Sequence, residues 1–292
     1  MAVKVLVTGS DGFLGTHLVR ALEGRGYDVF KLDKTRGHDL IVPSRWGTFL
    51  EGVDVVYHLA ALADVRSGKD QPMKVFEQNT QATLFLLEMM RRHGAKRIVF
   101  TSSAAVYGDL PTVPMSEDGP MPVQTSLYGA SKLAGEALLT AYARTFGFQV
   151  GIARLVQLLG PGYKHGHLWD VYQKVQTDPH HLFMDGAPDS ERQYLHVADA
   201  VLGLTMLAHA AISDEPVIWN LAQNGTLKIE ESVQLLLESL SLDPEIEWAG
   251  WRHAGDSEKI EVSTARADTA GWKALHGIPA AIQETAKSFS HE

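Results

Sequence analysis

The chain has 292 residues, of which 45% are hydrophobic and 21% are charged, the balance of an ordinary globular protein. This length allows one large α/β domain or a core domain with a smaller lobe. The formal net charge is −9 and there is no basic tail, which argues against nucleic acid as a partner, although a few placed arginines can still hold an anionic substrate. Cysteine is absent, which excludes disulfides, thiolate catalysis and cysteine-based zinc sites and fits a reducing cytoplasm.

The sequence predicts neither a targeting segment nor a membrane span. Residues 3–9 already form a strand and a turn, which leaves no room for a signal peptide. The longest apolar run, 200–212, is too short to cross a bilayer and contains His209, so we interpret it as a buried helix. We therefore expect a cytoplasmic protein with no membrane partner.

Strand and helix patterns alternate through the first half of the chain. A β-branched run at 3–7, closed by Gly9, predicts the first strand, and apolar residues at helical spacing predict a helix over 13–22. Further strands are expected at 28–32, 53–59, 98–103 and 149–156, and further helices at 79–90 and 127–146. Strands that alternate with helices predict an α/β fold with a doubly wound parallel sheet of the Rossmann type.

The pattern loosens after Gly160-Pro161-Gly162. Shorter strands and helices follow, with loops rich in Asp, Pro and Gly. We therefore assign residues 1–155 to the sheet domain and most of 156–292 to a second, smaller lobe, and we expect the chain to return to the first domain near 194–222.

Three glycines lie between the first strand and the first helix. Gly9, Gly12 and Gly15 permit a tight turn, close approach to a pyrophosphate and close packing of helix on strand, while the helix N-terminus offers free N–H groups. The spacing matches the commonest dinucleotide fingerprint only in part. Its place directly after the first strand nevertheless favours dinucleotide binding over a turn that only packs.

The carboxylate at the end of the second strand bears on the choice of cofactor. Asp33 lies where a carboxylate can accept hydrogen bonds from the adenosine ribose, and it would repel a 2′-phosphate, which favours NAD over NADP. The nearby cations Lys34 and Arg36 would attract a 2′-phosphate and so favour NADP. Asp39 and Leu40 are candidates to frame the adenine.

A tyrosine and a lysine lie four residues apart on the predicted helix over 127–146. A tyrosine has a pKa of about 10, too high for a base at neutral pH, but the Lys132 ammonium and the nicotinamide charge of NAD⁺ favour the Tyr128 phenolate. Tyr128 can then take a hydroxyl proton as hydride leaves the same carbon. Ser103 ends a buried strand, where ligands of parallel sheets bind, and can hydrogen-bond the reacting oxygen.

Taken together, these motifs closely resemble the extended branch of the short-chain dehydrogenase/reductase superfamily, the NAD-dependent epimerase/dehydratase family and in particular UDP-galactose 4-epimerase-like enzymes. The resemblance covers nearly the whole chain. The matching segments are 8–15, 58–61, Asn79, 101–108, 113–117, 128–132, Arg154 with 160–161, 192–199, 220–221, and Arg252 with 255–256.

The resemblance implies Tyr128 as acid/base, Ser103 as its oxygen-orienting partner, and Lys132 on the nicotinamide ribose. It implies a homodimer formed by the helices that carry Asn79 and Tyr128. The residues it assigns to NAD are Gly9, Asp11, Gly12, Phe13, Leu14, Gly15, Asp33, Asp39, Leu40, Leu59, Ala60, Ala61, Asn79, Tyr128 and Lys132, and those it assigns to the substrate are Ser103, Gln157, Arg192 and Arg252. The two arginines resemble the family's clamp on a sugar-nucleotide diphosphate, a task that suits a planar guanidinium.

Three departures from the family pattern bear on the substrate. Gln157 replaces the usual asparagine, which puts the usual diphosphate contact in doubt. Ala104 and Ala105 stand where dehydratases and decarboxylases carry an acid, which disfavours both activities. The chain is also short, which leaves room for a smaller substrate.

The predicted function is therefore an NAD-dependent sugar-nucleotide 4-epimerase that acts through a transient 4-keto sugar. The alternatives are a reductase of a keto-sugar nucleotide or smaller carbonyl, and a non-catalytic NAD(H)-binding regulator. No metal is expected, because His165, His167, His180 and His181 read as loop histidines without a carboxylate at ligand spacing. Aromatic residues of the second half read as core or groove walls, and His58 is expected beneath the cofactor. The aromatic residues in question are Trp169, Tyr172, Trp248, Trp251 and Trp272.

Overall fold

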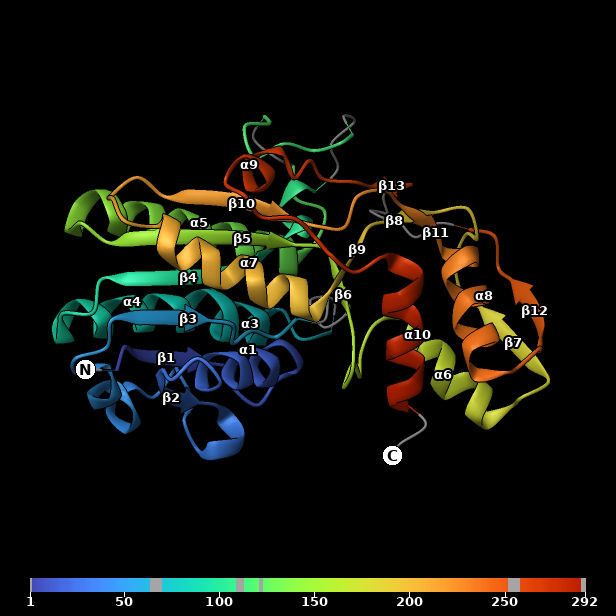
Figure 1. Cartoon of the computed structure of the whole chain (residues 1–292), viewed down its shortest axis with the longest axis horizontal. Helices are drawn as coiled ribbons and strands as arrows, with labels where there is room; N and C mark the ends of the chain where they lie inside the picture. Colours follow the sequence, from blue (N-terminus) through green and yellow to red (C-terminus); the bar gives the residue numbers. More distant parts are fainter. Residues whose placement is uncertain (1, 64–69, 109–112, 121–122, 252–257, 290–292) are drawn as a thin grey trace.

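The computed structural model describes residues 2–63, 70–108, 113–120, 123–251 and 258–289. Its centre is a six-stranded parallel sheet with the order β10-β5-β4-β3-β1-β2 (Figure 1). The strands are β1 (Lys4–Thr8), β2 (Asp28–Leu32), β3 (Val55–His58), β4 (Arg97–Ser103), β5 (Gln149–Leu155) and β10 (Val217–Leu221). The strand order turns at β1 and β3, the arrangement that places a ligand crevice at the carboxyl ends of a doubly wound sheet.

Helices cover both faces of the sheet. On one face, α1 (Phe13–Glu23) and α7 (Val197–Ala210) pack in a core with the β-branched residues of β1. On the other, α4 (Ala82–His93) and α5 (Leu127–Phe146) pack with the segment around Trp46. The doubly wound α/β fold is thus confirmed. The short helical turns are η1 (Lys34–Arg36), η2 (Pro43–Arg45), η3 (Gly47–Leu50), α3 (Pro72–Val75), η4 (Phe76–Gln81) and η5 (Ala104–Tyr107).

A second group of elements lies beyond the carboxyl ends of the strands (Figure 1). Its core is formed by α6 (His167–Thr177), α8 (Ile229–Leu240) and α10 (Ile278–Phe289). Trp169 and Tyr172 pack against Phe289 in this core, as their helical spacing predicts. The remaining elements are β6 (Gln157–Leu159), β7 (His181–Met184), β8 (Glu191–Arg192), β9 (Tyr194–His196), β11 (Leu227–Lys228), β12 (Glu245–Trp248), β13 (Lys259–Ile260) and α9 (Ala265–Thr269).

The helix predicted to begin at Asn79 begins earlier. Pro72 opens α3, and the backbone passes through a π-helical turn, η4, before α4. Asn79 was expected to open the helix, but its side chain bonds elsewhere and its carbonyl accepts the Thr83 hydroxyl inside the turn. The expected start was therefore wrong. The apolar run at 200–212 does belong to a buried helix, α7.

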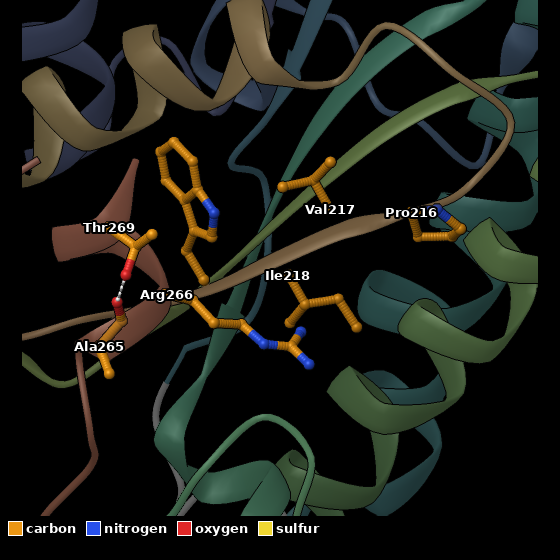
Figure 2. A pocket seen from close by; sticks show the side chains of 7 residues that line it. Pro216, Val217, Ile218, Ala265, Arg266 and Thr269 are labelled. Atoms are coloured by element: carbon orange, nitrogen blue, oxygen red, sulfur yellow. Dashed lines mark hydrogen bonds between the residues drawn. The ribbon is translucent and has the colours of Figure 1, made fainter. Parts of the chain in front are cut away.

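No helix in the described ranges is long and apolar enough to cross a bilayer. One edge of the central sheet is formed by β10. Pro216, directly before it, has no N–H to offer, and the Asn220 N–H that faces away from β5 donates to Glu117 Oε1 at 2.7 Å. An open groove of about 530 Å³ lies between this strand and α9, beside Arg266 (Figure 2). None of the predicted site residues in the described part of the chain lines it.

Candidate active site

The predicted site residues of the first domain gather at the carboxyl ends of the central strands. Thr8 is paired in register with His58 on the neighbouring β3, and Ser103 with Leu155 on β5. The loops that follow β1, β3 and β4 therefore leave the sheet along one edge. This is the edge at which parallel sheets bind their ligands.

The glycine turn is packed too tightly for side chains. Gly9 has a left-handed φ of +70°, and a Cβ there would lie 2.8 Å from the Ala60 amide nitrogen. A Cβ at Gly15 would lie 2.0 Å from the Gly9 carbonyl oxygen, so α1 can approach the turn only with glycine. The result is a bare backbone cradle at the N-terminus of an 11-residue helix. Such a cradle fits the pyrophosphate of a dinucleotide.

Asp33 caps η1 at the end of β2. Its carboxylate accepts from the Asp11 amide at 3.1 Å and from the Thr35 amide at 3.0 Å. Hydrogen bonds from Thr35 and Arg36 lower the pKa of Asp11. Arg36 pairs with Asp11 at 2.9 Å and Lys34 with Asp39 at 3.1 Å. Each cation beside Asp33 thus already has a carboxylate partner.

The other residues predicted to hold NAD lie around this turn. Leu40 is buried in the core between the sheet and helices α4 and α5, and Leu59 packs on the core between the sheet and helices α1 and α7. The Ala60 amide donates to Thr8 Oγ1 at 3.2 Å. Phe13 has another neighbour: its ring meets the Tyr163 ring edge-on, with centroids 5.8 Å apart, and so joins the first turn of α1 to the second lobe. Leu14 packs partly on the core, and Ala61 follows Ala60 in the loop after β3.

Ser103 and Tyr128 meet at the end of β4. The Ser103 Oγ accepts the Ala105 amide at 3.1 Å, and the Ser103 side chain acts to lower the pKa of the Tyr128 hydroxyl. Tyr128 lies in the first turn of α5, which begins where Ser126 accepts the Gly129 amide at 3.0 Å. Burial raises the pKa of Tyr128 to about 12, and the polar Ser103 side chain acts against that rise. In this structure the direction is therefore opposite to the predicted lowering, because burial outweighs the polar contacts.

Lys132 lies one turn further along α5 and is only 3% exposed. Its Nζ donates to the Thr101 carbonyl at 2.8 Å and lies 4.9 Å from the centre of the Phe100 ring. Burial lowers the pKa of Lys132 to about 7, with Glu136 acting in the other direction. The lysine is therefore anchored to β4, the strand that ends at Ser103.

His58 is held by a relay of hydroxyls that the sequence reading did not find. Its Nδ1 lies 2.8 Å from Thr8 Oγ1, and its Nε2 lies 2.9 Å from Thr83 Oγ1, which donates to the Asn79 carbonyl. Burial, with the Lys132 charge, lowers the pKa of His58 to about 3, so the ring is neutral. His58 is thus a structural tie under the glycine turn.

Asn79 is buried, and its amide is fully engaged. Its Oδ1 accepts the Leu62 amide at 2.7 Å, and its Nδ2 donates to Ser131 Oγ at 2.9 Å and to the Leu62 carbonyl. Asn79 therefore fixes the loop after β3 against α5, on the helix turn that presents Tyr128 and Lys132.

A buried ion pair behind the site was also missed. Arg154 on β5 reaches Glu136 on α5 at 2.7 Å, and its Nη1 donates to the Tyr107 hydroxyl at 3.0 Å. Glu136 also accepts from Ser102, and Tyr107 donates to Asn220 at 2.8 Å. No local signal could reveal this set, because its members lie 18 to 113 positions apart.

Two of the predicted substrate residues, Gln157 and Arg192, lie in the second lobe. Gln157 opens β6, and its amide nitrogen donates to Tyr163 Oη at 2.9 Å. Arg192 ends β8 and donates to the Glu191 carbonyl at 2.8 Å. Arg252 lies outside the described residues.

The histidines also differ in part from prediction. His167 is not a loop residue, because it opens α6 and bonds Ser232 and Gln157. His181 opens β7, where it pairs with Asp178. Within the described part of the chain, no three His, Asp or Glu side chains are grouped as metal ligands.

Comparisons with known proteins agree with this geometry. The model of the NAD dependent epimerase/dehydratase family matches residues 5–222. A UDP-glucose 4-epimerase of Corynebacterium glutamicum is 28% identical over 99% of this chain and 96% of its own length. The uncharacterized UDP-glucose epimerase YtcB of Bacillus subtilis is 31% identical over 70% of this chain and 72% of its own.

Solved structures show the same relationship. A UDP-galactose 4-epimerase is 30% identical with a TM-score of 0.88, and the match covers 99% of both chains. The Thermus thermophilus UDP-glucose 4-epimerase in complex with NAD is 28% identical with a TM-score of 0.85, again over 99% of both chains. This chain belongs to the NAD dependent epimerase/dehydratase family and is an enzyme of the extended short-chain dehydrogenase/reductase type.

Proposed function

We propose that this enzyme is an NAD-dependent sugar-nucleotide 4-epimerase. The observation that carries the proposal is the placement of Ser103 at the end of β4 and of Tyr128 in the first turn of α5, at the sheet edge that also carries the bare glycine cradle. Two relatives whose similarity to this chain extends over 99% of its length are named UDP-glucose 4-epimerases. Their names support this activity over others of the family.

The chain's own groups supply the proton chemistry and the orientation. NAD held by the glycine cradle and Asp33 would supply the reversible hydride acceptor for the sugar carbon. Tyr128 takes the proton of the C4 hydroxyl and gives it back to the 4-keto oxygen, while Ser103 hydrogen-bonds the same oxygen. The positive charge of Lys132, fixed at the Thr101 carbonyl, holds the nicotinamide ribose and favours the phenolate.

The adenosine end of the site favours NAD over NADP. Asp33 would repel a 2′-phosphate, and the two nearby cations, Lys34 and Arg36, are already paired with Asp39 and Asp11. Asp33 therefore decides the preference through its charge and through the hydrogen bonds it offers the ribose hydroxyls.

The substrate is a nucleoside diphosphate hexose, held in the second lobe. Arg192 and Arg252 are the cations proposed for the diphosphate, since charge-assisted bonds to arginine are the strong kind. Ala104 is buried beside Ser103 and offers no acid for a further proton transfer, which argues against dehydration or decarboxylation.

The test is to incubate purified enzyme with UDP-galactose and to follow UDP-glucose formation without added cofactor. We expect turnover, together with NAD(H) released on denaturation, because an epimerase regenerates its cofactor in each cycle. Turnover only with stoichiometric added NADH or NADPH would instead indicate a reductase. Bound NAD without turnover on any sugar nucleotide would indicate a regulator.

Tyr128→Phe tests the proposed acid/base role of Tyr128. It removes one hydroxyl and keeps the buried ring, so folding and NAD content should be unchanged while kcat falls by about 10²–10⁴-fold. A kcat close to that of the wild type would refute Tyr128 as the acid/base.

A further inference from the structure

The chain has three asparagines, at positions 79, 220 and 224, and the last of them differs from the other two. Asn79 and Asn220 are buried, at 4% and 0% exposure, and their side-chain amides are hydrogen-bonded. Asn220 Nδ2, for example, donates to the Met115 and Ser263 carbonyls at 3.2 and 3.0 Å. Asn224 is exposed, and the residue that follows it is a glycine. Asn224 is thus the one asparagine whose amide the fold leaves uncovered.

Asn224 lies in a bulge on the connection from β10 to β11. On one side of the bulge the Gln223 N–H donates to the Tyr194 carbonyl at 2.9 Å, and on the other side Leu227 is paired with Arg192. Three residues of the connection therefore stand opposite a single residue of the facing segment. Surplus residues cannot join a ladder of backbone hydrogen bonds, so they stay outside it.

Within the described ranges, neither the Asn224 side-chain amide nor the Gly225 N–H is hydrogen-bonded to another residue. Gly225 has a φ of +84°, and a Cβ at this position would have nothing within 4 Å. Glycine also places no side chain beside its own nitrogen. The Gly225 nitrogen can therefore reach Asn224 Cγ without breaking a hydrogen bond.

We propose that Asn224 is a site of spontaneous deamidation in the folded enzyme. The Gly225 nitrogen loses its proton to hydroxide and attacks Asn224 Cγ, and the new N–Cγ bond closes a succinimide ring. The Cγ–Nδ2 bond breaks as the leaving nitrogen takes a proton from water and departs as ammonia. Water then opens the ring at either carbonyl, which gives aspartate or isoaspartate. No oxidant or reductant takes part.

The fold prevents the same reaction at the two buried asparagines. Asn79 holds the Leu62 amide with its side chain, so attack on its Cγ would first cost this bond. Asn220 lies inside β10, and its amide is held by the two carbonyls named above. The residues that follow them, Thr80 and Leu221, also place a branched side chain beside the nitrogen that would attack.

Deamidation changes both the charge and the backbone of this connection. The product carboxylate is ionised at neutral pH, so each event adds one negative charge to a protein whose formal net charge is −9. The isoaspartyl product also runs the main chain through the side-chain carbon, which lengthens the connection by one atom. The enzyme therefore accumulates an acidic form with age, whichever substrate it acts on.

Peptide mass spectrometry of the enzyme as purified tests the site. Samples incubated at pH 8.5 and at pH 7.5 are digested at acid pH, which slows further reaction. We expect the mass gain of an amide converted to an acid at Asn224, about tenfold faster at pH 8.5, because the attacking nitrogen must lose its proton. Asn79 and Asn220 are internal controls and should keep their amides. An intact Asn224, or equal conversion at all three positions, would overturn the proposal.

Mass is the appropriate readout because the chain also contains three Asp–Gly pairs, at 11–12, 118–119 and 185–186. Aspartate at such pairs can isomerise through the same ring, but its mass does not change. A mass gain in the peptide that carries Asn224 therefore reports loss of its amide and no other reaction of this kind.

The same incubation in guanidinium chloride compares the folded chain with the unfolded chain. Because the bulge leaves the reacting groups unbonded, deamidation of Asn224 should be no more than about fivefold slower in the folded enzyme. A larger suppression would show that the fold protects Asn224, and the proposal would fail.

Gly225→Ala tests the attacking nitrogen, because the added methyl group crowds it. We expect deamidation of Asn224 to slow about tenfold. Gly271→Ala is the matched control: its φ is +90° and a Cβ there also has nothing within 4 Å, so it carries the same backbone strain away from Asn224. Asn224→Ser should remove the acidic form from isoelectric focusing. Equal rates in the two alanine variants, or an acidic form that persists in Asn224→Ser at the wild-type rate, would refute the site.

Discussion

At the scale of single residues, Lys132 stands out because it is both buried and ionisable. Its pKa in the folded protein is about 7, against about 10.4 for a free lysine. Between these values the unfolded chain binds a proton that the folded chain does not. Stability therefore rises as pH rises through this window, and the burial cost is fully present below pH 7.

Lys132→Met removes this dependence. We expect nucleotide-free Lys132→Met to be more stable than wild type at pH 6.5, by an amount on the order of 1–3 kcal/mol, with a smaller difference at pH 9.5. Urea unfolding at the two pH values measures it. A stability difference that is the same at both would show that packing, and not the charge, accounts for the effect.

Some residues of the site can be recognised from the neighbouring sequence, whereas others depend on contacts with distant segments of the chain. Ser103, Tyr128 and Lys132 lie at strand ends and helix spacing that the sequence displays, and the structure brings Ser103 and Tyr128 together. His167 was misplaced, because its partners Gln157 and Ser232 are 10 and 65 positions away. Hydrogen bonds between distant segments leave no periodic trace.

At the scale of elements, α5 is joined to β5 by the buried pair of Glu136 and Arg154. Both side chains are nearly inaccessible, at 6% and 11% exposure, so removing one partner leaves an uncompensated buried charge. We expect Arg154→Met to lower the free energy of unfolding by about 3–5 kcal/mol. Denaturant unfolding checks this loss.

A double-mutant cycle separates the pair from the packing. Glu136→Leu alone should also be destabilising, whereas Glu136→Leu with Arg154→Met should cost clearly less than the sum of the two single changes. Additive losses would show that the two groups contribute independently.

Most elements of the sheet domain could be predicted because their apolar residues recur with the clear spacing of a helix or a buried strand. Helix α5 was predicted with the bounds observed, and strands β4 and β5 to within one residue. The start of the helix containing Asn79 could not be predicted, since asparagine is a common helix cap and its role in a π-helical turn depends on Leu62 and Ser131.

At the scale of the whole molecule, we propose a homodimer formed by α4, α5 and the segment before them. The described surface there exposes apolar side chains that a monomer does not need: Met73 is 68% exposed, Phe76 51% and Leu127 51%. Helix α3 packs beside α5, so these residues belong to one region.

Phe76→Asp should disrupt this interface. We expect light scattering with size exclusion to give a dimer for the wild type and a monomer for the variant, because a carboxylate would be buried without a partner. Leu275 is 75% exposed and lies outside this region, so the Leu275→Asp variant is the control and should remain dimeric. A monomeric wild type would contradict the proposal.

The protected edge of β10 has a consequence for the protein in a crowded cell. A sheet edge with free N–H and C=O groups is a template onto which other chains add as strands. Here Pro216 offers no donor and Glu117 occupies the Asn220 N–H, so an incoming strand would find two gaps within five residues. Strand addition at this end of the sheet is therefore disfavoured by the residues that begin and cap the strand.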